Sequence, residues 1–435
     1  MLLAVVVIAV SGVLVSRGLY ADGALFLLNI LKDKGYWNYD PARSFAQIVT
    51  QSPVVLALWL GMRDIDLLVH AHSVGLIVLP LLAWLAALML AARTPLSLPL
   101  TLAFSVSYLT TGFFAIGEFN LTYALSALCF TLLLRGELGI VASIALVLSA
   151  LTLTRAYEAM LFLGPLLFLI SIRRLLEDRG RDRRSTTVAI VSASFFFAAA
   201  SALAAWSVLH PRDPGNLAGA TNFGQVIGTA QFKYVAFMLA VYAAHRVLDR
   251  VAYQGLLVLV ALIASLVYLM NAGFWSSVEV HYAFRTVSGL LLFAVLSWTS
   301  LDVLAKRAFS WLNPASPRVA ARSALTVYSL FIGLGTAFLV NTFQFGAWVR
   351  SFESSAIEAT RWVPFDDTDV YAGGGVYDRF SWPWANPTLS LILRGDNRAG
   401  ILNHSEYEGW QPFEPETMPT DPMAPYSRRR FSSDR

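Results

Sequence analysis

Runs of apolar residues, separated by short polar stretches, follow one another along most of this chain. A helix needs about 20 mostly apolar residues to cross a bilayer, with a range of about 17–25. By that measure the pattern predicts about eleven membrane-spanning helices. Their ranges are 1–16, 67–91, 97–116, 120–134, 139–154, 158–172, 187–208, 231–245, 253–270, 286–304 and 324–345.

Composition strengthens this interpretation. Hydrophobic residues make up 57% of the chain and charged residues 14%, whereas a soluble domain is usually about a quarter charged. The chain is therefore expected to be an all-α polytopic membrane protein. Its net charge of +4 is small and its basic residues fall in short loops, so we expect no nucleic-acid partner. The single cysteine, Cys129, excludes an intrachain disulfide.

Lysine and arginine predict the orientation, because loops rich in these residues stay in the cytoplasm. With a cytoplasmic N-terminus, the alternation of basic and non-basic loops holds through all the predicted spans. The inner loops then carry Arg93, Arg135 and the segments 173–184, 245–250 and 306–322. The first span lacks the basic start of a signal peptide, so we expect it to be retained. The residue usage suggests a bacterium, and hence a multi-pass protein of the inner membrane.

This topology divides the chain into a membrane domain, residues 1–345, and a periplasmic C-terminal tail, residues 346–435. In the tail, TLSLILRGDNRAGILNH at 388–404 predicts a β-hairpin with a GDNR turn. The last stretch, 418–435, is expected to be disordered. Three tail tryptophans suit a small core or an interface belt, and are also residues that stack on sugar rings: Trp382, Trp384 and Trp410.

Residues 17–66 form the first outer loop and predict two juxtamembrane helices. In DGALFLLNILKDKG, Asp22 stands at the N-cap position and Gly35 follows the last turn. RSFAQIVTQSPVVLALWLG, at 43–61, predicts a second interfacial helix that is broken near Pro53. The order along the chain is span, acid, interfacial helix, aromatic turn, interfacial helix, span.

That order, with the motif YADGALFLLNIL at 20–31, resembles the GT-C superfamily of membrane glycosyltransferases. The resemblance implies transfer of a sugar, with inversion, from a polyprenyl-phosphate-linked donor to a lipid, glycan or other acceptor on the periplasmic face. Asp22 matches the family's acidic motif and is the candidate general base. The family often has two acids at this point, whereas Gly23 follows Asp22 here. We expect no cofactor, and membrane lipids as surroundings.

The chemistry suits a carboxylate at this position. Glycosyl transfer needs a base near the acceptor oxygen, and partial burial makes a carboxylate a better base because it raises the pKa. The leaving group is a lipid phosphate, so cations are needed nearby. Asp22 is equally well placed to cap its own helix by accepting from the backbone N–H of Ala24 or Leu25, and the two roles are compatible.

Other ionisable residues gather at the predicted outer ends of the spans. Glu118 is either a substrate-binding carboxylate or an ordinary turn residue. Arg155 and Glu158 either pair on one helix face or offer Arg155 to the donor phosphate, with Glu158 orienting it. A further group precedes the tenth span, where we favour phosphate binding over anchoring at the membrane interface: Glu279, His281 and Arg285.

One further motif concerns a possible metal site. A pattern that a divalent metal can use is formed by Asp64, Asp66, His70 and His72. This spacing is common by chance and Asp64 also suits a helix cap, so we assign no metal site.

The alternatives to glycosyl transfer are an envelope polysaccharide polymerase or ligase, and a lipid or sugar transporter or flippase. A transporter would place charges at the bilayer midplane, where these spans have almost none.

Overall fold

The structure is a computed structural model that describes residues 1–110, 117–135, 138–177, 184–211, 221–247, 251–271, 281–308, 317–359, 362–372, 380–382, 385–395, 400–401 and 423–426. The described residues are almost entirely helical, which confirms the predicted all-α class. Each range predicted to span the membrane contains a helix or a run of joined helices.

The helices of the N-terminal half are α1 (Leu2–Leu14), α2 (Asp22–Asp33), α3 (Ser44–Trp59), α4 (Ile65–Ser73), α5 (Leu79–Ala91), α6 (Ser97–Phe104), α7 (Glu118–Leu134), α8 (Ile140–Leu153), α9 (Met160–Glu177) and α10 (Arg184–Leu209). Short 3₁₀ turns, η1 (Arg17–Leu19) and η2 (Pro41–Arg43), precede α2 and α3. Two π-helical segments, η3 (Val74–Val78) and η4 (Ser105–Leu109), continue α4 and α6.

The remaining helices are α12 (Phe223–Gly228), α13 (Ala230–Val247), α14 (Val251–Met270), α15 (His281–Ala308), α16 (Pro317–Glu358), η6 (Phe365–Asp367), α17 (Asp369–Ala372) and α18 (Asn386–Arg394). Two short strands, β1 (Trp362–Val363) and β2 (Gly400–Ile401), pair in parallel. Helix α16 continues without a break past residue 345, where the sequence predicts the end of the last span.

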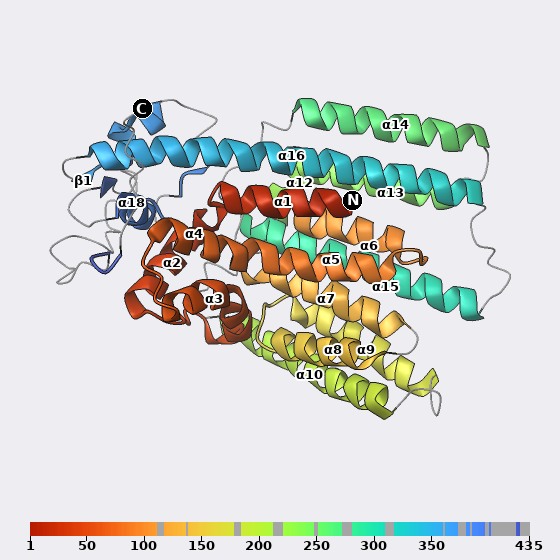
Figure 1. Ribbon diagram of the computed structural model, residues 1–435. Helices are drawn as coiled ribbons and strands as arrows, with labels where there is room; N and C mark the ends of the chain where they lie inside the picture. Colours follow the sequence, from red (N-terminus) through yellow and green to blue (C-terminus); the bar gives the residue numbers. More distant parts are fainter. Residues whose placement is uncertain are drawn as a thin grey trace.

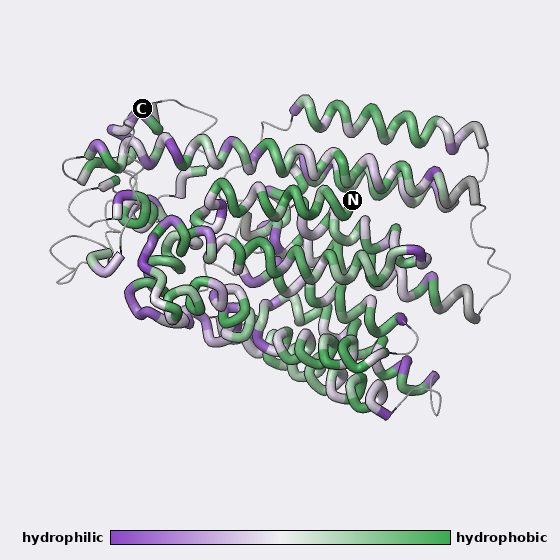
Figure 2. Tube along the Cα trace, in the orientation of Figure 1, coloured by the Kyte–Doolittle hydropathy of each residue, from purple (hydrophilic) through white to green (hydrophobic). Residues whose placement is uncertain are grey.

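The long helices lie side by side and successive ones run in opposite directions (Figure 1). Helices α2, α3 and α18 gather at one end of this bundle, which we call the loop end. Hydrophobic residues dominate along the helices, and hydrophilic ones collect at both ends (Figure 2). Among the described residues, five helical stretches are long and apolar enough to cross a membrane: Ile65–Ala91, Arg184–Leu209, Tyr253–Met270, Ala283–Val303 and Ala321–Glu358.

Two local predictions are wrong. The segment predicted as a β-hairpin begins with α18, and its later residues Gly400 and Ile401 pair in parallel with β1 rather than in a hairpin. Helix α3 is not broken at Pro53 but runs through it as one helix. Of the predicted tail core, Trp382 is buried, whereas Trp384 and Trp410 lie outside the described residues.

Glycine permits the close approach of α3 to η3. A Cβ on Gly75 would collide with the backbone carbonyl oxygen of Thr50. Gly255, in α14, has no heavy atom within 4 Å of the corresponding position. The two glycines therefore differ in packing although both lie in helical segments.

We expect Gly75→Ala to destabilise the protein by about 1–3 kcal/mol, since the backbone of α3 must move away. Gly255→Ala should be neutral or stabilising by up to about 1 kcal/mol, because alanine favours helix and meets nothing. Thermal unfolding of both variants in detergent micelles measures the difference. Equal shifts of the unfolding midpoint would contradict this account of the packing.

Candidate functional site

Asp22 lies in a turn whose backbone is strained at Ala21. The Gly23 N–H donates to the Tyr20 carbonyl at 3.0 Å, closing a turn over Ala21 and Asp22. Ala21 has φ 52° and ψ −129°, the geometry of the first central residue of a type II′ turn, where glycine is usual. Asp22 is the first residue of α2, and the N-cap position belongs to Ala21, one residue earlier than predicted. The residue at the N-cap position is therefore Ala21, whose side chain cannot cap the helix, and not Asp22 as predicted.

The same turn is held from α4 and η1. His72, fully buried in α4, places Nε2 3.0 Å from the Gly23 carbonyl oxygen, and since that oxygen only accepts, Nε2 carries the proton. The Gly18 N–H donates to Ser73 Oγ at 3.0 Å. A Cβ at Gly23 would collide with the Gly18 carbonyl oxygen. An acidic side chain at position 23 therefore does not fit this backbone.

The C-terminal tail holds α2 at both of its ends. Trp382 Nε1 donates to the Tyr20 hydroxyl at 3.1 Å, two residues before Asp22. At the other end of the helix, the Tyr426 hydroxyl donates to the Leu31 carbonyl at 2.6 Å. Residues from opposite ends of the sequence thus meet around the helix that begins with Asp22.

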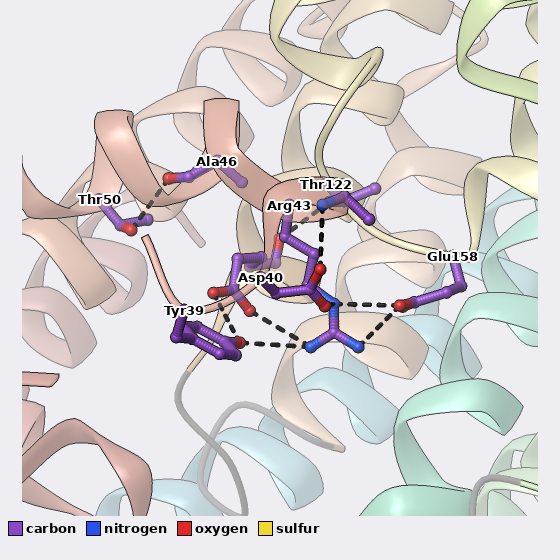
Figure 3. Close-up of polar contacts among 9 residues, drawn as sticks. Tyr39, Asp40, Arg43, Ala46, Thr50, Thr122 and Glu158 are labelled. Atoms are coloured by element: carbon purple, nitrogen blue, oxygen red, sulfur yellow. Dashed lines mark hydrogen bonds and ion pairs between the residues drawn. The ribbon is translucent and has the colours of Figure 1, made fainter. Parts of the chain in front are cut away.

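Arg43 ties the first loop to the bundle. The turn Asp40-Pro41 sets its direction, because the Asp40 side chain accepts from the Ala42 N–H at 2.9 Å and proline suits the first helical position. The Arg43 guanidinium donates to Glu158 Oε1 through Nη2 at 2.7 Å and through Nε at 3.1 Å (Figure 3). Its Nη1 lies 3.8 Å from Glu118 Oε2, and its Nε lies 3.3 Å from Asp40 Oδ2.

Tyrosines complete what we call the Arg43 cluster: Tyr39, Asp40, Arg43, Glu118, Tyr157 and Glu158. The Tyr39 hydroxyl donates to Glu118 Oε1 at 3.0 Å and accepts from Arg43 Nη1 at 3.3 Å. The Arg43 guanidinium lies 5.0 Å from the centre of the Tyr157 ring, within range of a cation–π contact. Three carboxylates thus surround one arginine at the loop end.

Asp22 is electrostatically linked to this cluster through Tyr39. Burial raises the pKa of Tyr39, and the negative charges of Glu118 and Asp22 raise it further. The Tyr39 ring stacks on Phe26, one turn after Asp22 on α2, with 4.8 Å between ring centres. Trp37 stacks on Tyr39 at 5.3 Å. An aromatic layer therefore joins the start of α2 to the cluster.

The cluster keeps its central charge. Burial alone lowers the pKa of Arg43, but Tyr39, Glu158 and Glu118 outweigh it, so the pKa stands above its ordinary value. Glu118 is buried at the start of α7, and Glu158 comes from the turn between α8 and α9. An unpaired charge at this depth is costly. The ion pairs therefore hold three separate parts of the chain together.

The structure brings together four of the residues singled out in the sequence. Glu118 and Glu158 contact Tyr39 and Arg43 directly, and Asp22 lies near enough for its charge to raise the pKa of Tyr39. Burial raises the pKa of Tyr157, and the nearby positive charge of Arg285 is the leading opposing influence, which places Arg285 beside the cluster. The Arg285 guanidinium lies 5.7 Å from the Phe119 ring centre.

Of the two alternatives for Arg155 and Glu158, the structure does not show pairing on one helix face. They lie in the turn between α8 and α9, and Glu158 is ion-paired with Arg43. Arg155 contributes its carbonyl, which accepts from the N–H groups of Phe45 at 3.1 Å and Ala46 at 3.3 Å, and its side chain is exposed. The start of α3 is thereby capped by a distant turn.

The other predicted residues are less fully placed. His281 is the first residue of α15, one turn before Arg285, and Glu279 lies outside the described residues. Asp64 caps α4 as expected, accepting from the N–H of Asp66 at 3.1 Å and of Leu67 at 3.2 Å. Within the described ranges, no group of three His, Cys, Asp or Glu residues is arranged to hold a metal ion.

Sequence reasoning missed Arg43 and Tyr39, the residues that connect the predicted ones. The available signal was the dipeptide Asp40-Pro41, which starts turns and here precedes a lone arginine beside three aromatic residues. His72 was considered only as a metal ligand, although its hydrogen bond supports the turn at Gly23.

Two neighbouring substitutions in the Asp22 turn should have opposite effects. Ala21→Gly should stabilise the protein by up to about 1 kcal/mol, because glycine adopts this positive φ without strain. Gly23→Ala should destabilise it by about 1–3 kcal/mol, because the new methyl group displaces the Gly18 carbonyl. Thermal unfolding in detergent distinguishes them, and shifts of the same sign would argue against the turn geometry.

The raised pKa of Tyr39 predicts a pH dependence of stability. A free tyrosine loses its proton near pH ~10. Above that pH the unfolded chain binds fewer protons than the folded one, so stability falls as pH rises. Tyr39→Phe removes this contribution, and its unfolding midpoint should fall less steeply than that of the wild type above about pH 10. Parallel slopes would contradict the raised pKa of Tyr39, whatever the difference in absolute stability.

Comparisons with known proteins identify no relative of this chain. No model of a protein family, no curated protein and no solved structure matches this chain. The function is therefore inferred from the residues at the loop end and from the membrane-protein-like helical architecture that carries them.

Proposed function

We propose that this protein is a membrane glycosyltransferase of the GT-C type. It has about eleven membrane crossings and a cytoplasmic N-terminus, and it lies in the bacterial inner membrane with its loop end in the periplasm. It moves a sugar from a polyprenyl-phosphate-linked donor to a lipid, glycan or other acceptor. The proposal needs no bound cofactor.

The observation that carries the proposal is the position of Asp22. This carboxylate stands at the start of α2, in a turn held by His72 and Trp382, and its charge reaches Tyr39. Strained backbone persists only where its surroundings enforce it, and it is concentrated at functional sites. A fixed carboxylate at a membrane edge is what a general base for a lipid-linked sugar requires.

In the proposed step, Asp22 takes the proton of the acceptor hydroxyl as that oxygen attacks the anomeric carbon of the sugar. A new carbon–oxygen bond forms on one face, and the bond to the lipid phosphate breaks on the other. The polyprenyl phosphate leaves with the bonding electron pair, so the configuration is inverted. Positive charge near the leaving oxygens lowers the barrier.

The charges at the loop end suggest which residues serve that phosphate. Arg43 is ion-paired to Glu158 and Glu118, so its charge is already balanced. Arg155, with an exposed side chain, and Arg285, on the adjacent α15, are the arginines we assign to the donor phosphate. We assign His281 and Glu279, which the sequence groups with Arg285, to the same donor-phosphate or substrate-binding site. Glu118 and Glu158 act in this proposal by positioning Arg43.

Asp22→Asn should reduce transfer by about 10²–10⁴-fold, the usual contribution of a general base. The assay uses membranes containing the full chain, a panel of labelled polyprenyl-phosphate sugars and endogenous acceptors. Asp33→Asn, at the exposed far end of the same helix, is the matched control and should retain wild-type transfer.

Undiminished transfer by a folded Asp22→Asn variant would eliminate Asp22 as the base. Movement of a lipid or sugar across the membrane without any covalent change would instead support the transporter alternative. Thermal unfolding of each variant separates loss of chemistry from loss of fold.

A further inference from the structure

Tyr157 belongs to the Arg43 cluster through its ring, but its hydroxyl takes no part in the cluster. The residue lies in the turn between α8 and α9, and its side chain is partly exposed. The Arg43 guanidinium lies 5.0 Å from the centre of its ring, and the Phe119 ring lies 6.0 Å from it. Within the described part of the chain, no hydrogen bond joins the Tyr157 hydroxyl to the protein.

Neighbouring tyrosines use their hydroxyl groups inside the protein. The Tyr39 hydroxyl donates to Glu118 at 3.0 Å, and the Tyr123 hydroxyl, from α7, donates to the Arg285 carbonyl at 2.6 Å. Hydrogen bonds within the protein are also made by the hydroxyls of Tyr20, Tyr36 and Tyr426. The hydroxyl of Tyr157 differs from these because it can bind a ligand without giving up a contact within the protein.

Arg285 approaches Tyr157 from α15. The two side chains contact the same ring, because the Arg285 guanidinium lies 5.7 Å and the Tyr157 ring 6.0 Å from the centre of Phe119. Arg155 stands two residues before Tyr157 in the same turn, and its side chain is exposed. Tyr157 is therefore a neighbour of both arginines that we assign to the donor phosphate, of Arg285 in space and of Arg155 along the chain.

The Tyr157 phenol keeps its proton at neutral pH. An ordinary tyrosine loses it at about pH 10. Burial raises the pKa of Tyr157 further, and this effect outweighs the opposing positive charge of Arg285. A protonated phenol is a hydrogen-bond donor without a charge of its own, and a hydrogen bond from it to an ionised oxygen is short and strong. A hydroxyl of this kind beside arginine suits a phosphate oxygen.

We propose that the Tyr157 hydroxyl donates a hydrogen bond to a non-bridging oxygen of the donor phosphate, beside Arg285. This inference rests on the proposed function, in which a polyprenyl phosphate is the leaving group. The hydrogen bond strengthens as negative charge grows on that phosphate, so it contributes to the transfer step as well as to binding, and Tyr157 keeps its proton throughout. Because the ring of Tyr157 contacts Arg43, the phosphate site adjoins the Arg43 cluster.

The first test is binding of polyprenyl phosphate to the purified, delipidated full chain, measured by native mass spectrometry, with the uncharged polyprenol of equal length as reference. Tyr157→Phe should lose about tenfold in affinity for the phosphate and none for the alcohol. Its unfolding midpoint should match that of the wild type, because the hydroxyl has no partner in the described protein. Tyr36→Phe removes a hydroxyl that pairs with Ser52, and as the control it should bind both lipids normally.

Equal affinities of the wild type and Tyr157→Phe for polyprenyl phosphate would overturn the proposal. Tighter binding of phosphatidic acid than of polyprenyl phosphate, lost in the same variant, would overturn the assignment to the donor and indicate a site for ordinary lipid head groups.

Transfer kinetics separate this inference from the proposed function. In Tyr157→Phe, kcat/KM for the polyprenyl-phosphate sugar should fall about 10–100-fold. Wild-type transfer that the variant retains in full would refute the role of Tyr157 and leave glycosyl transfer intact. A preference for the phosphate that depends on Tyr157, in a protein that transfers no sugar, would support the phosphate site and count against glycosyl transfer.

Discussion

The ion pairs of Arg43 are the interaction on which the loop end depends. One guanidinium of the first loop is shared between Glu118 and Glu158, which belong to the bundle, and Asp40 of its own turn, so it fixes that turn against α7 and the turn between α8 and α9. Removing charges from water is costly, and the cost is offset only when the partners are close and well oriented. Displacing the loop would leave Glu118 buried without its cation. The interaction therefore selects one arrangement.

The ion pairs of Arg43 also affect the position of α2. The stacked rings of Trp37, Tyr39 and Phe26 connect the Arg43 turn to the first turns of α2. Contacts from α4 and from the tail then enforce a backbone at Ala21 that alanine by itself disfavours. Asp22 thus occupies one place relative to the bundle. Under the proposed function, this preorganisation lets the carboxylate act with little rearrangement.

The ion pairs also limit what the site can do. An arginine that is already balanced by carboxylates attracts a phosphate weakly, so donor recognition under the proposed function falls to arginines outside the cluster. One end of the bundle thereby combines a fixed acid, Asp22, with a structural arginine whose charge is already balanced.

Much of the fold was predictable because hydropathy is a local property. A helix occurs at each predicted apolar range, and the start of α2 was misplaced by one residue only. The tail was mispredicted because the alternation in TLSLIL outweighed two helix signals: Pro387 in the first turn of α18, and Gly395, which ends the helix at φ 81°.

The sequence by itself determined the helices, the membrane character and the candidate acids, Asp22, Glu118 and Glu158 among them. Only the tertiary structure decided which of these meet. Arg43 lies 115 residues from Glu158, and Trp382 lies 362 residues from Tyr20. Such pairings depend on how the helices pack. Hydropathy reports how each segment interacts with its surroundings, but not which neighbours it has.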